Sequence, residues 1–292
     1  MSLIERLVDM RLSDPLGFAA RIVGRQASTW RPEEPLMVIA ADHPARGALR
    51  AGADPNAMGD REELLSRCVR ALSRPGVNGF LGTCELVADL ANLGALDGKV
   101  VFGSMNRGGF AGACFELDDR MTGYDAHGIE TDNLAGGKML LRYDLSDPAT
   151  LATVEAVAQT VTQLGRSRRI ALVEPFMASR DAEGRVVNDL SVEAVVKSVA
   201  MTAGLGASSA WTWLKLPAVE PMEAVARASS MPILLLGGEV PDDAERTRRL
   251  WAQALKPASV RGLVMGRALL YPEGGDVETA VDEAVKLLKR SE

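Results

Sequence analysis

AWTWLKL, residues 210–216, is a short apolar run of the kind that forms a buried β-strand, yet Lys215 lies inside it. An ammonium group buried without a partner is costly, so it usually pairs with an acid or loses its proton. RIALVEPF, residues 169–176, presents the complementary case, because Glu174 lies inside an equally apolar run. Opposite charges on neighbouring strands can pair, so we expect these two stretches to lie side by side in one sheet.

Six further apolar runs are followed, like these two, by a turn and then by a segment with helical periodicity. They are LMVIAAD (36–42), GVNGFLG (76–82), KVVFGSM (99–105), KMLLRYD (138–144), PILLLGG (232–238) and RGLVMGR (261–267). Continuous apolar runs are typical of parallel strands covered on both faces. Strands that alternate with helices in this way predict an α/β protein with a single, closed (β/α)8 TIM barrel. An open doubly wound sheet is the alternative, but the units are similar in length and no linker divides the chain.

The barrel prediction assigns the whole chain, 1–292, to one domain. Residues 1–30 are expected to be a helical lead-in, 36–275 the barrel, and 276–292 a C-terminal helix. Several helices between strands have clear start signals; DPATLATVEAVAQTVTQL, for example, has a capping Asp147 followed by Pro148 at the first helical position. The Gly-rich segment 109–135 is the exception, because its helical pattern is weak.

Composition limits the cellular location and the classes of binding partner that are expected. The formal net charge of −6 argues against a nucleic-acid partner. No apolar run approaches the roughly 18 residues of a membrane span, so no membrane partner is expected. The three cysteines lack close spacing, which fits a reducing, cytoplasmic location. Self-association into a homo-oligomer stays open, because exposed apolar helix faces of barrels frequently pair subunits.

Polar residues gather where the predicted strands end, which is where TIM barrels carry their chemistry. They are Asp42 and Arg46 after the first strand, Asn106 and Arg107 after the third, Lys138 and Arg142 on the fourth, Glu174 on the fifth and Lys215 on the sixth. A buried Lys–Glu pair that only fixes the barrel register is one interpretation, although such pairs are often no more stable than apolar replacements. The functional interpretation is covalent catalysis. A neutral Lys215 amine would attack a carbonyl to form a Schiff base, and Glu174 would shuttle protons.

Lys138 is the alternative nucleophile. It lies near the start of its strand, so we expect it deeper in the barrel than Lys215. A metal-dependent reaction is disfavoured, because the two histidines, His43 and His127, are not spaced as a ligand pair. The predicted chemistry therefore uses no metal and no cofactor.

Glycines close the last two predicted strands, as Gly237-Gly238 and as Gly266 followed by Arg267. The corresponding loops of TIM barrels often bind phosphate, because glycine exposes backbone N–H groups and an arginine adds a charge-assisted contact. The alternative is that these glycines only make tight turns.

Together these motifs resemble those of the class I, Schiff-base aldolases of the deoxyribose-phosphate and tagatose-bisphosphate aldolase superfamily, over residues 36–275. AADHPARGAL (40–49) looks like the DQRGAL of tagatose-bisphosphate aldolases with two residues inserted, and GGKMLLRYD (136–144) is similar to their fourth strand. LVEPF (172–176) matches the strand of their acid/base glutamate, and WLKLP (213–217) matches the strand of their Schiff-base lysine. The whole pattern is closest to an aldolase-like branch of this superfamily.

The resemblance implies a role for each matching residue. Glu174 would be the acid/base and Lys215 the Schiff-base lysine. The predicted phosphate site is Gly237, Gly238, Gly266 and Arg267, and the predicted substrate-binding set is Asp42, Arg46, Lys138, Arg142 and Arg107. Two departures, the altered first loop at residues 43–45 and Glu239 beside the phosphate turn, argue against a bisphosphate substrate.

The predicted function is therefore a lyase that cleaves or forms an aldol bond in a sugar phosphate or a related keto compound. Two alternatives use the same barrel: a Schiff-base or thioester acyltransferase, and a non-catalytic sugar-phosphate sensor. Ketose phosphates and deoxy-keto acid phosphates both remain candidate substrates.

Overall fold

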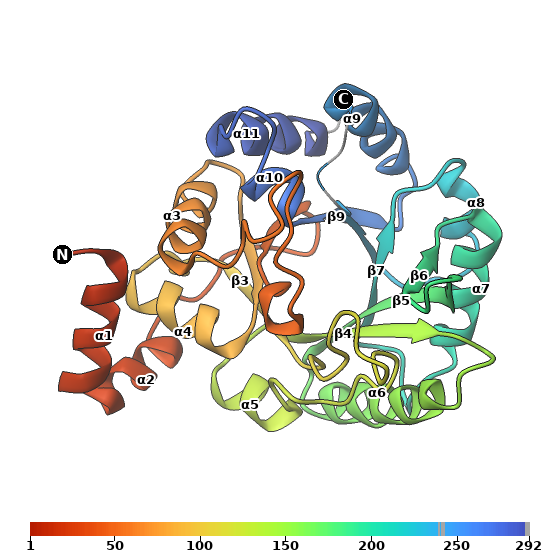
Figure 1. The fold of residues 1–292 in the computed structure, drawn as a ribbon, viewed down its shortest axis with the longest axis horizontal. Helices are drawn as coiled ribbons and strands as arrows, with labels where there is room; N and C mark the ends of the chain where they lie inside the picture. Colours follow the sequence, from red (N-terminus) through yellow and green to blue (C-terminus); the bar gives the residue numbers. More distant parts are fainter. Residues whose placement is uncertain (239, 241–242, 290–292) are drawn as a thin grey trace.

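The computed structural model describes residues 1–238, 240 and 243–289. Within these residues, eight parallel strands close into a ring (Figure 1). In ring order they are β1 (Leu36–Ala40), β2 (Gly79–Gly82), β3 (Val100–Ser104), β4 (Gly136–Tyr143), β5 (Ile170–Arg180), β7 (Thr212–Pro217), β8 (Ile233–Leu236) and β9 (Val260–Met265). β9 pairs with β1, for example Val264 with Val38, and this pairing closes the ring. The predicted (β/α)8 barrel is confirmed, and the open sheet is excluded.

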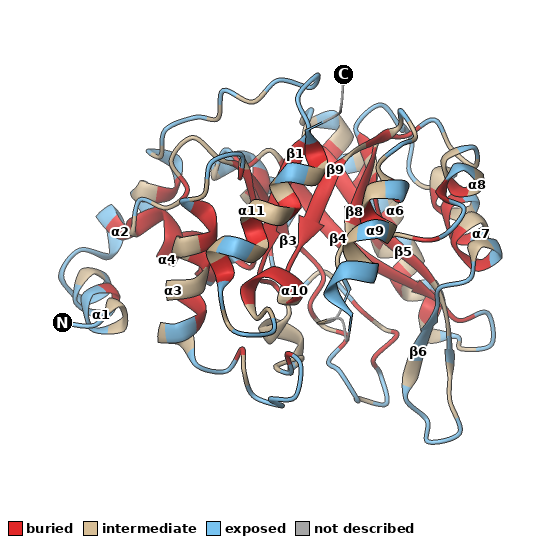
Figure 2. Cartoon of the chain, turned by 90° about the horizontal axis from the view of Figure 1, so that it is seen from above, coloured by how far each residue is buried: buried red, intermediate tan, exposed pale blue. Residues whose placement is uncertain are grey.

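Side chains of alternating parity fill the inside of the ring. The inner apolar cluster consists of Leu36, Val38, Ala40, Leu81, Val100, Phe102, Ile170, Leu172, Leu234 and Val264. The residues between them face outward and join the larger core beneath the helices, so the strands are buried on both faces (Figure 2). Trp30 and Trp213 meet edge to face, with ring centroids 6.2 Å apart, beside the inner cluster. Apolar side chains thus fill the part of the barrel on the amino-terminal side of the strands.

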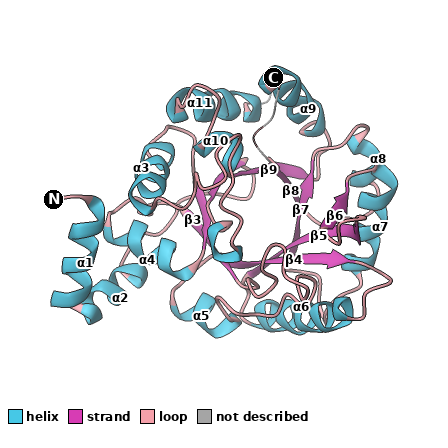
Figure 3. Ribbon diagram, viewed as in Figure 1, coloured by secondary structure: helices cyan, strands magenta, loops and turns pink. Residues whose placement is uncertain are grey.

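Helices surround the ring, as Figure 3 shows. The lead-in is α1 (Leu3–Ser13) and α2 (Pro15–Val23), followed by η1 (Pro44–Arg46), α3 (Arg61–Leu72), α4 (Cys84–Asn92), α5 (Ala126–Thr131), α6 (Ala149–Arg166), α7 (Val192–Ala203), α8 (Met222–Ala226), α9 (Ala244–Ala254), α10 (Arg267–Leu270) and α11 (Val277–Leu288). In α6 the N-cap is Pro148, one residue later than the predicted cap at Asp147, which instead accepts a hydrogen bond from the Ala149 backbone. In the described part of the chain, no helix combines the length and apolar character needed to cross a bilayer.

One strand was not predicted. β6 (Val186–Asp189) lies outside the ring and pairs antiparallel with the end of β5, from Met177↔Asp189 to Arg180↔Val186. Its residues are half-buried or exposed, so the sequence VVND lacks the apolar run that marks the ring strands. The fifth ring strand is therefore longer than predicted, and the sixth to eighth ring strands are β7, β8 and β9.

Gly262 is required where β9 passes between β1 and β8. Its φ is +155°, and a Cβ there would lie 2.0 Å from the Leu36 carbonyl oxygen. We therefore expect Gly262→Ala to lower the free energy of unfolding by about 2–3 kcal/mol through overpacking and backbone strain. Gly165→Ala is the control, because that position in α6 has open space around it and alanine favours helix by about 0.5 kcal/mol or more. Urea unfolding measures both, and equal stabilities of the two variants would contradict this account of the ring closure.

Candidate active site

Glu174 lies between two buried lysines at the carboxyl end of the strands. Its Oε1 is 2.9 Å from Lys215 Nζ, and its Oε2 is 2.6 Å from Lys138 Nζ. All three side chains are at most a tenth exposed. The predicted pairing of Lys215 with Glu174 is thus present, and Lys138 joins it as a second cation on the same carboxylate.

The order of the strands explains this arrangement. β5 pairs with β4 on one side and with β7 on the other, so a β5 side chain inside the ring lies between those of its neighbours. Glu174 continues the inward series of Ile170 and Leu172, and Lys215 follows Trp213 on the inner face of β7. Alternation along the strands therefore turns all three charged groups inward, above the apolar filling of the barrel.

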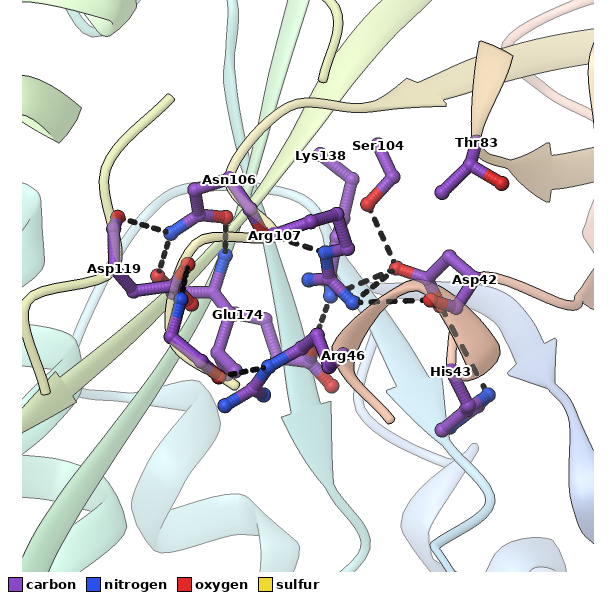
Figure 4. Close-up of polar contacts among 12 residues, drawn as sticks. Asp42, His43, Arg46, Thr83, Ser104, Asn106, Arg107, Asp119, Lys138 and Glu174 are labelled. Atoms are coloured by element: carbon purple, nitrogen blue, oxygen red, sulfur yellow. Dashed lines mark hydrogen bonds and ion pairs between the residues drawn. The ribbon is translucent and has the colours of Figure 1, made fainter. Parts of the chain in front are cut away.

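Asp42 adds a second carboxylate to this cluster on the side of β1 (Figure 4). The four groups Asp42, Lys138, Glu174 and Lys215 alternate in sign and are here called the charge row. Asp42 Oδ2 is 3.3 Å from Lys138 Nζ and 3.0 Å from Arg107 Nη1, and it accepts a hydrogen bond of 2.8 Å from Ser104 Oγ. Burial opposes the ionisation of Asp42, but Lys138 and Arg107 outweigh it and hold its pKa well below the usual range. Asp42, Arg107 and Lys138, predicted to bind substrate, are thus brought together around one carboxylate.

The charges of this row also shift the pKa values of Glu174 and Lys138. Burial opposes the ionisation of Glu174, but Lys138 and Lys215 outweigh it and lower its pKa to about 2. Burial and the nearby Arg107 lower the pKa of Lys138 to about 8, against the raising effect of Asp42 and Glu174. At neutral pH both carboxylates are ionised, while Lys138 loses its proton more readily than an ordinary lysine.

His43 borders this cluster on the β1 side. Its Nδ1 is buried and lies 3.9 Å from Asp42 Oδ1. Burial lowers the pKa of His43 to about 3, with Asp42 opposing and the positive charge of Arg267 adding to the effect, so the imidazole is neutral at pH 7. His127 lies in α5. Among the described residues, no three His, Cys, Asp or Glu side chains gather in a way that could hold a metal ion.

Arg46 and Arg142 meet a partner that the sequence did not indicate. Arg142 Nη1 is 2.5 Å from Glu116 Oε1, and its Nη2 donates to the Glu116 carbonyl oxygen at 2.8 Å. Arg46 Nη2 is 3.5 Å from the same Oε1. The guanidinium of Arg142 is therefore directed to Glu116 rather than to the pair Lys215–Glu174.

The two predicted phosphate turns lie side by side, because β8 and β9 are paired up to Leu236↔Val264. Gly238 has a φ of +70°, which favours glycine. At Gly266 a Cβ would come within 2.8 Å of the Ala40 carbonyl oxygen and 2.9 Å of His43 Cε1, so this turn packs against the end of β1. Arg267 begins α10, directly after Gly266. Glu239, which the sequence placed beside this turn, is outside the described residues.

Two polar residues of the site, Ser104 and Glu116, were missed by sequence reasoning, whereas Asn106 was recognised as a polar residue at the end of the third strand. Ser104 binds Asp42, and Asn106 receives the Leu140 N–H on its Oδ1 at 2.7 Å and donates to the Asp119 carbonyl oxygen at 3.2 Å. Both continue the inward alternation of Val100 and Phe102 along β3, and this alternation is the signal that could have found Ser104. Glu116 has no such signal, because it lies in the irregular segment between β3 and α5.

Comparison with known proteins identifies relatives for the whole barrel. The model of the Cgl0159-like family matches residues 34–285. The crystal structure of Cgl0159 from Corynebacterium glutamicum is 48% identical, with 98% of this chain and 96% of that chain covered and a TM-score of 0.94. No curated protein matches the sequence.

More distant structures share the fold. An archaeal fructose 1,6-bisphosphate aldolase has a TM-score of 0.63 at 13% identity, with 93% of this chain and 98% of that chain covered. A fructose-bisphosphate aldolase from Slackia heliotrinireducens has a TM-score of 0.61 at 15% identity, with 95% and 85% covered. At this level of identity these neighbours show that the barrel fold is shared. They do not bear on the deoxyribose-phosphate and tagatose-bisphosphate branch that the motifs resemble.

The charge row predicts an acid-sensitive stability. The pKa of Glu174 is lowered from 4.5 to about 2, so its ionisation stabilises the fold above pH 4.5, and this contribution is lost as the pH falls toward 2. In Glu174→Gln the contribution is absent, so the stability difference from the wild type should shrink by about 2 kcal/mol between pH 5.5 and pH 3. Urea unfolding at both pH values measures it. A difference that does not change with pH would show that Glu174 is not held ionised by its lysines.

Proposed function

The chain belongs to the Cgl0159-like family, and from this premise we propose that it is a class I aldolase, a carbon–carbon lyase that acts through a Schiff base on Lys215. The substrate is a sugar phosphate or a related keto compound. The observation that carries the proposal is the buried carboxylate of Glu174, 2.9 Å from Lys215 and 2.6 Å from a second lysine. Stability gives little reason to bury such a cluster, whereas imine chemistry needs an amine, an acid/base and a proton relay in contact.

Two comparisons support this choice of chemistry. One structural neighbour, an archaeal fructose-1,6-bisphosphate aldolase at 14% identity, is described with its catalytic lysine covalently bound to the carbinolamine intermediate of its substrate. The stretches LVEPF and WLKLP, which carry Glu174 and Lys215, also resemble the acid/base and Schiff-base strands of tagatose-bisphosphate aldolases. Fold and motifs thus point to the same type of reaction.

The first steps form the imine. Glu174 first takes the ammonium proton of Lys215, 2.9 Å away, and the neutral amine then attacks the carbonyl carbon while an amine proton passes to the carbonyl oxygen to give a carbinolamine. Glu174 moves the protons of this step, and Lys138, with a pKa of about 8, exchanges protons with it across 2.6 Å. Glu174 returns its proton to the new hydroxyl group, which leaves as water, and the resulting protonated imine carries the positive charge that the Lys215 ammonium carried before.

The next steps break the carbon–carbon bond. Glu174 takes the proton of the hydroxyl group beside the scissile bond. As this bond breaks, its electron pair moves toward the imine nitrogen, which gives an enamine and releases an aldehyde. Protonation of the enamine carbon and hydrolysis of the imine release the second product and restore Lys215. No electron acceptor is needed, because these steps involve no net oxidation.

The remaining predicted site residues would hold the substrate. The adjacent turns after β8 and β9 present Gly237, Gly238, Gly266 and Arg267 to a phosphate group. Asp42 and Arg107, held together at 3.0 Å, would bind hydroxyl groups between the phosphate and the far end of the substrate.

Lys138 is the rival nucleophile, and its lowered pKa would favour it on electrostatic grounds alone. Its contacts argue the other way, because it is held between Asp42 at 3.3 Å and Glu174 at 2.6 Å. Among the described residues, Lys215 pairs with Glu174 alone. A covalent bond at Lys138 would disturb both carboxylates, whereas an imine on Lys215 leaves the pair of Asp42 and Lys138 in place.

Borohydride trapping tests the assignment. We expect incubation with a panel of ketose and keto-acid phosphates, followed by reduction and peptide mass mapping, to give an adduct on Lys215. Lys215→Ala should lose the adduct and all cleavage activity. Lys138→Ala is the matched control and should keep the adduct, with kcat lowered about 100-fold or more by the loss of proton transfer.

Other outcomes of this experiment would overturn parts of the proposal. An adduct on Lys138 would exchange the roles of the two lysines. Tight binding of a sugar phosphate without cleavage and without an adduct would favour a sensor, and turnover dependent on a thioester would favour an acyltransferase.

A further inference from the structure

Residues 108–121, here called the mouth segment, connect β3 toward α5 beside β4 (Figure 1). Hydrogen bonds fix its base. The Gly109 backbone donates to Asp119 Oδ1 at 2.9 Å, and the Asp119 backbone donates to Thr153 Oγ1 of α6 at 2.8 Å. Arg46 ties the segment to the first loop, because its Nε donates to the Gly109 carbonyl oxygen and its own carbonyl accepts from Ala111, both at 2.8 Å. The mouth segment is thus an ordered part of the site's rim.

Glu116 is the acidic side chain that the mouth segment brings to the arginines. It is 8% exposed. Its Oε1 lies 2.5 Å from Arg142 and 3.5 Å from Arg46, and its Oε2 accepts from the Gly112 backbone at 2.8 Å. Every oxygen of this carboxylate therefore has a partner, and two guanidinium groups share it.

Arg46 and Arg107, which pairs with Asp42, retain capacity for an anion. Their Nη2 atoms are buried and make no hydrogen bond to any described residue, and the ion-pair contact of Arg46 Nη2 with Glu116 Oε1 is long, at 3.5 Å. Burial lowers the pKa of Arg46 to about 10, and the charges of Arg142 and Arg107 add to this effect against the raising effect of Asp119 and Glu116. Guanidinium groups bind carboxylate and phosphate through paired N–H donors, so an anionic end of a substrate would be drawn to this place.

The position of this cluster relates it to the predicted phosphate turns. Arg142 lies on β4, and Arg267 follows β9. Three strands separate β4 from β9 in either direction around the ring, so these two strands lie on opposite sides of the barrel mouth. A substrate with its phosphate at the β8 and β9 turns would extend its other end toward Arg46 and Glu116.

We propose that Glu116 is a specificity-determining residue that fills the arginine subsite of Arg46 and Arg142 with its own carboxylate, so that the substrate's far end carries no second phosphate. This inference rests on the proposed function, which places one phosphate at the turns after β8 and β9. A second phosphate, with a charge of about −1.5 to −2, would have to lie beside the Glu116 carboxylate or displace it. A neutral hydroxyl end can accept a hydrogen bond from Arg46 without this repulsion.

Hexitol phosphates test the inference by binding alone, because they lack a carbonyl and cannot form an imine. We expect isothermal titration calorimetry of the wild type to give glucitol 1,6-bisphosphate no more than about threefold tighter binding than the better of the two glucitol monophosphates. Glu116→Gln should bind the bisphosphate at least about tenfold more tightly than the wild type does, with monophosphate binding changed less than about twofold.

Asp118→Asn is the matched control. It removes the same charge from the same segment, but Asp118 pairs with the exposed Arg120 at 2.7 Å rather than with the arginine subsite. This variant should bind all three compounds as the wild type does. A circular-dichroism melt checks that Glu116→Gln is folded, and the wild-type comparison of mono- and bisphosphates does not depend on any variant.

Three results would overturn the inference. The first is wild-type binding of the bisphosphate at least tenfold tighter than of either monophosphate. The second is an equal gain for mono- and bisphosphates in Glu116→Gln, which would be a general charge effect. The third is no binding of any hexitol phosphate, because then no phosphate is held at the opposite turns. Trapping on Lys215 decides the aldolase proposal separately in each case.

Discussion

The burial of Glu174 between Lys138 and Lys215 is the constraint on which the rest of the site depends. A carboxylate in this position is tolerated only because both of its oxygens meet an ammonium group, at 2.9 and 2.6 Å. Removal of one partner from a buried ion pair typically costs about 3–5 kcal/mol, because the remaining charge is left uncompensated. The strands β4, β5 and β7 must therefore be neighbours in the ring. The alternation that turns these three side chains inward must also continue to the carboxyl end of each strand. Fold and chemistry are coupled through this one carboxylate.

Much of the barrel could be predicted because its strands are covered on both faces. Apolar runs such as PILLLGG need no knowledge of their neighbours to be recognised, and Lys215 and Glu174 are conspicuous because each interrupts such a run. β6 was not predicted, because its residues are not covered on both faces. VVND is largely exposed, and it forms a strand only because β5 extends past the ring and offers an edge.

The missed polar residues show a second limit of sequence reasoning. Ser104 is a small polar side chain in an apolar strand, so its role is visible only once Asp42 is known to lie across from it at 2.8 Å. Glu116 meets Arg142, 26 residues away, through an irregular segment whose path no periodicity encodes. Strand parity predicts which residues face the inside of a barrel, but it cannot predict what a long loop brings to them.

The arrangement of charges also explains how one site could hold an amine and its acid so close together. An ammonium group and a protonated imine carry the same charge at the same place, so Glu174 keeps its partner while Lys215 changes its covalent state. Lys138 and Asp42, 3.3 Å apart, remain a pair beside this change, while Glu174 takes up and returns the proton that moves. The apolar filling below, with Trp213 two residues from Lys215 on the same inner face, leaves these few groups to exchange protons with one another rather than with bulk water. In the resting site and in the protonated imine, each carboxylate of the row therefore faces a cation. While the nitrogen of Lys215 is neutral, Glu174 holds the proton and Lys138 stays beside Asp42, so the buried charges remain paired as protons move.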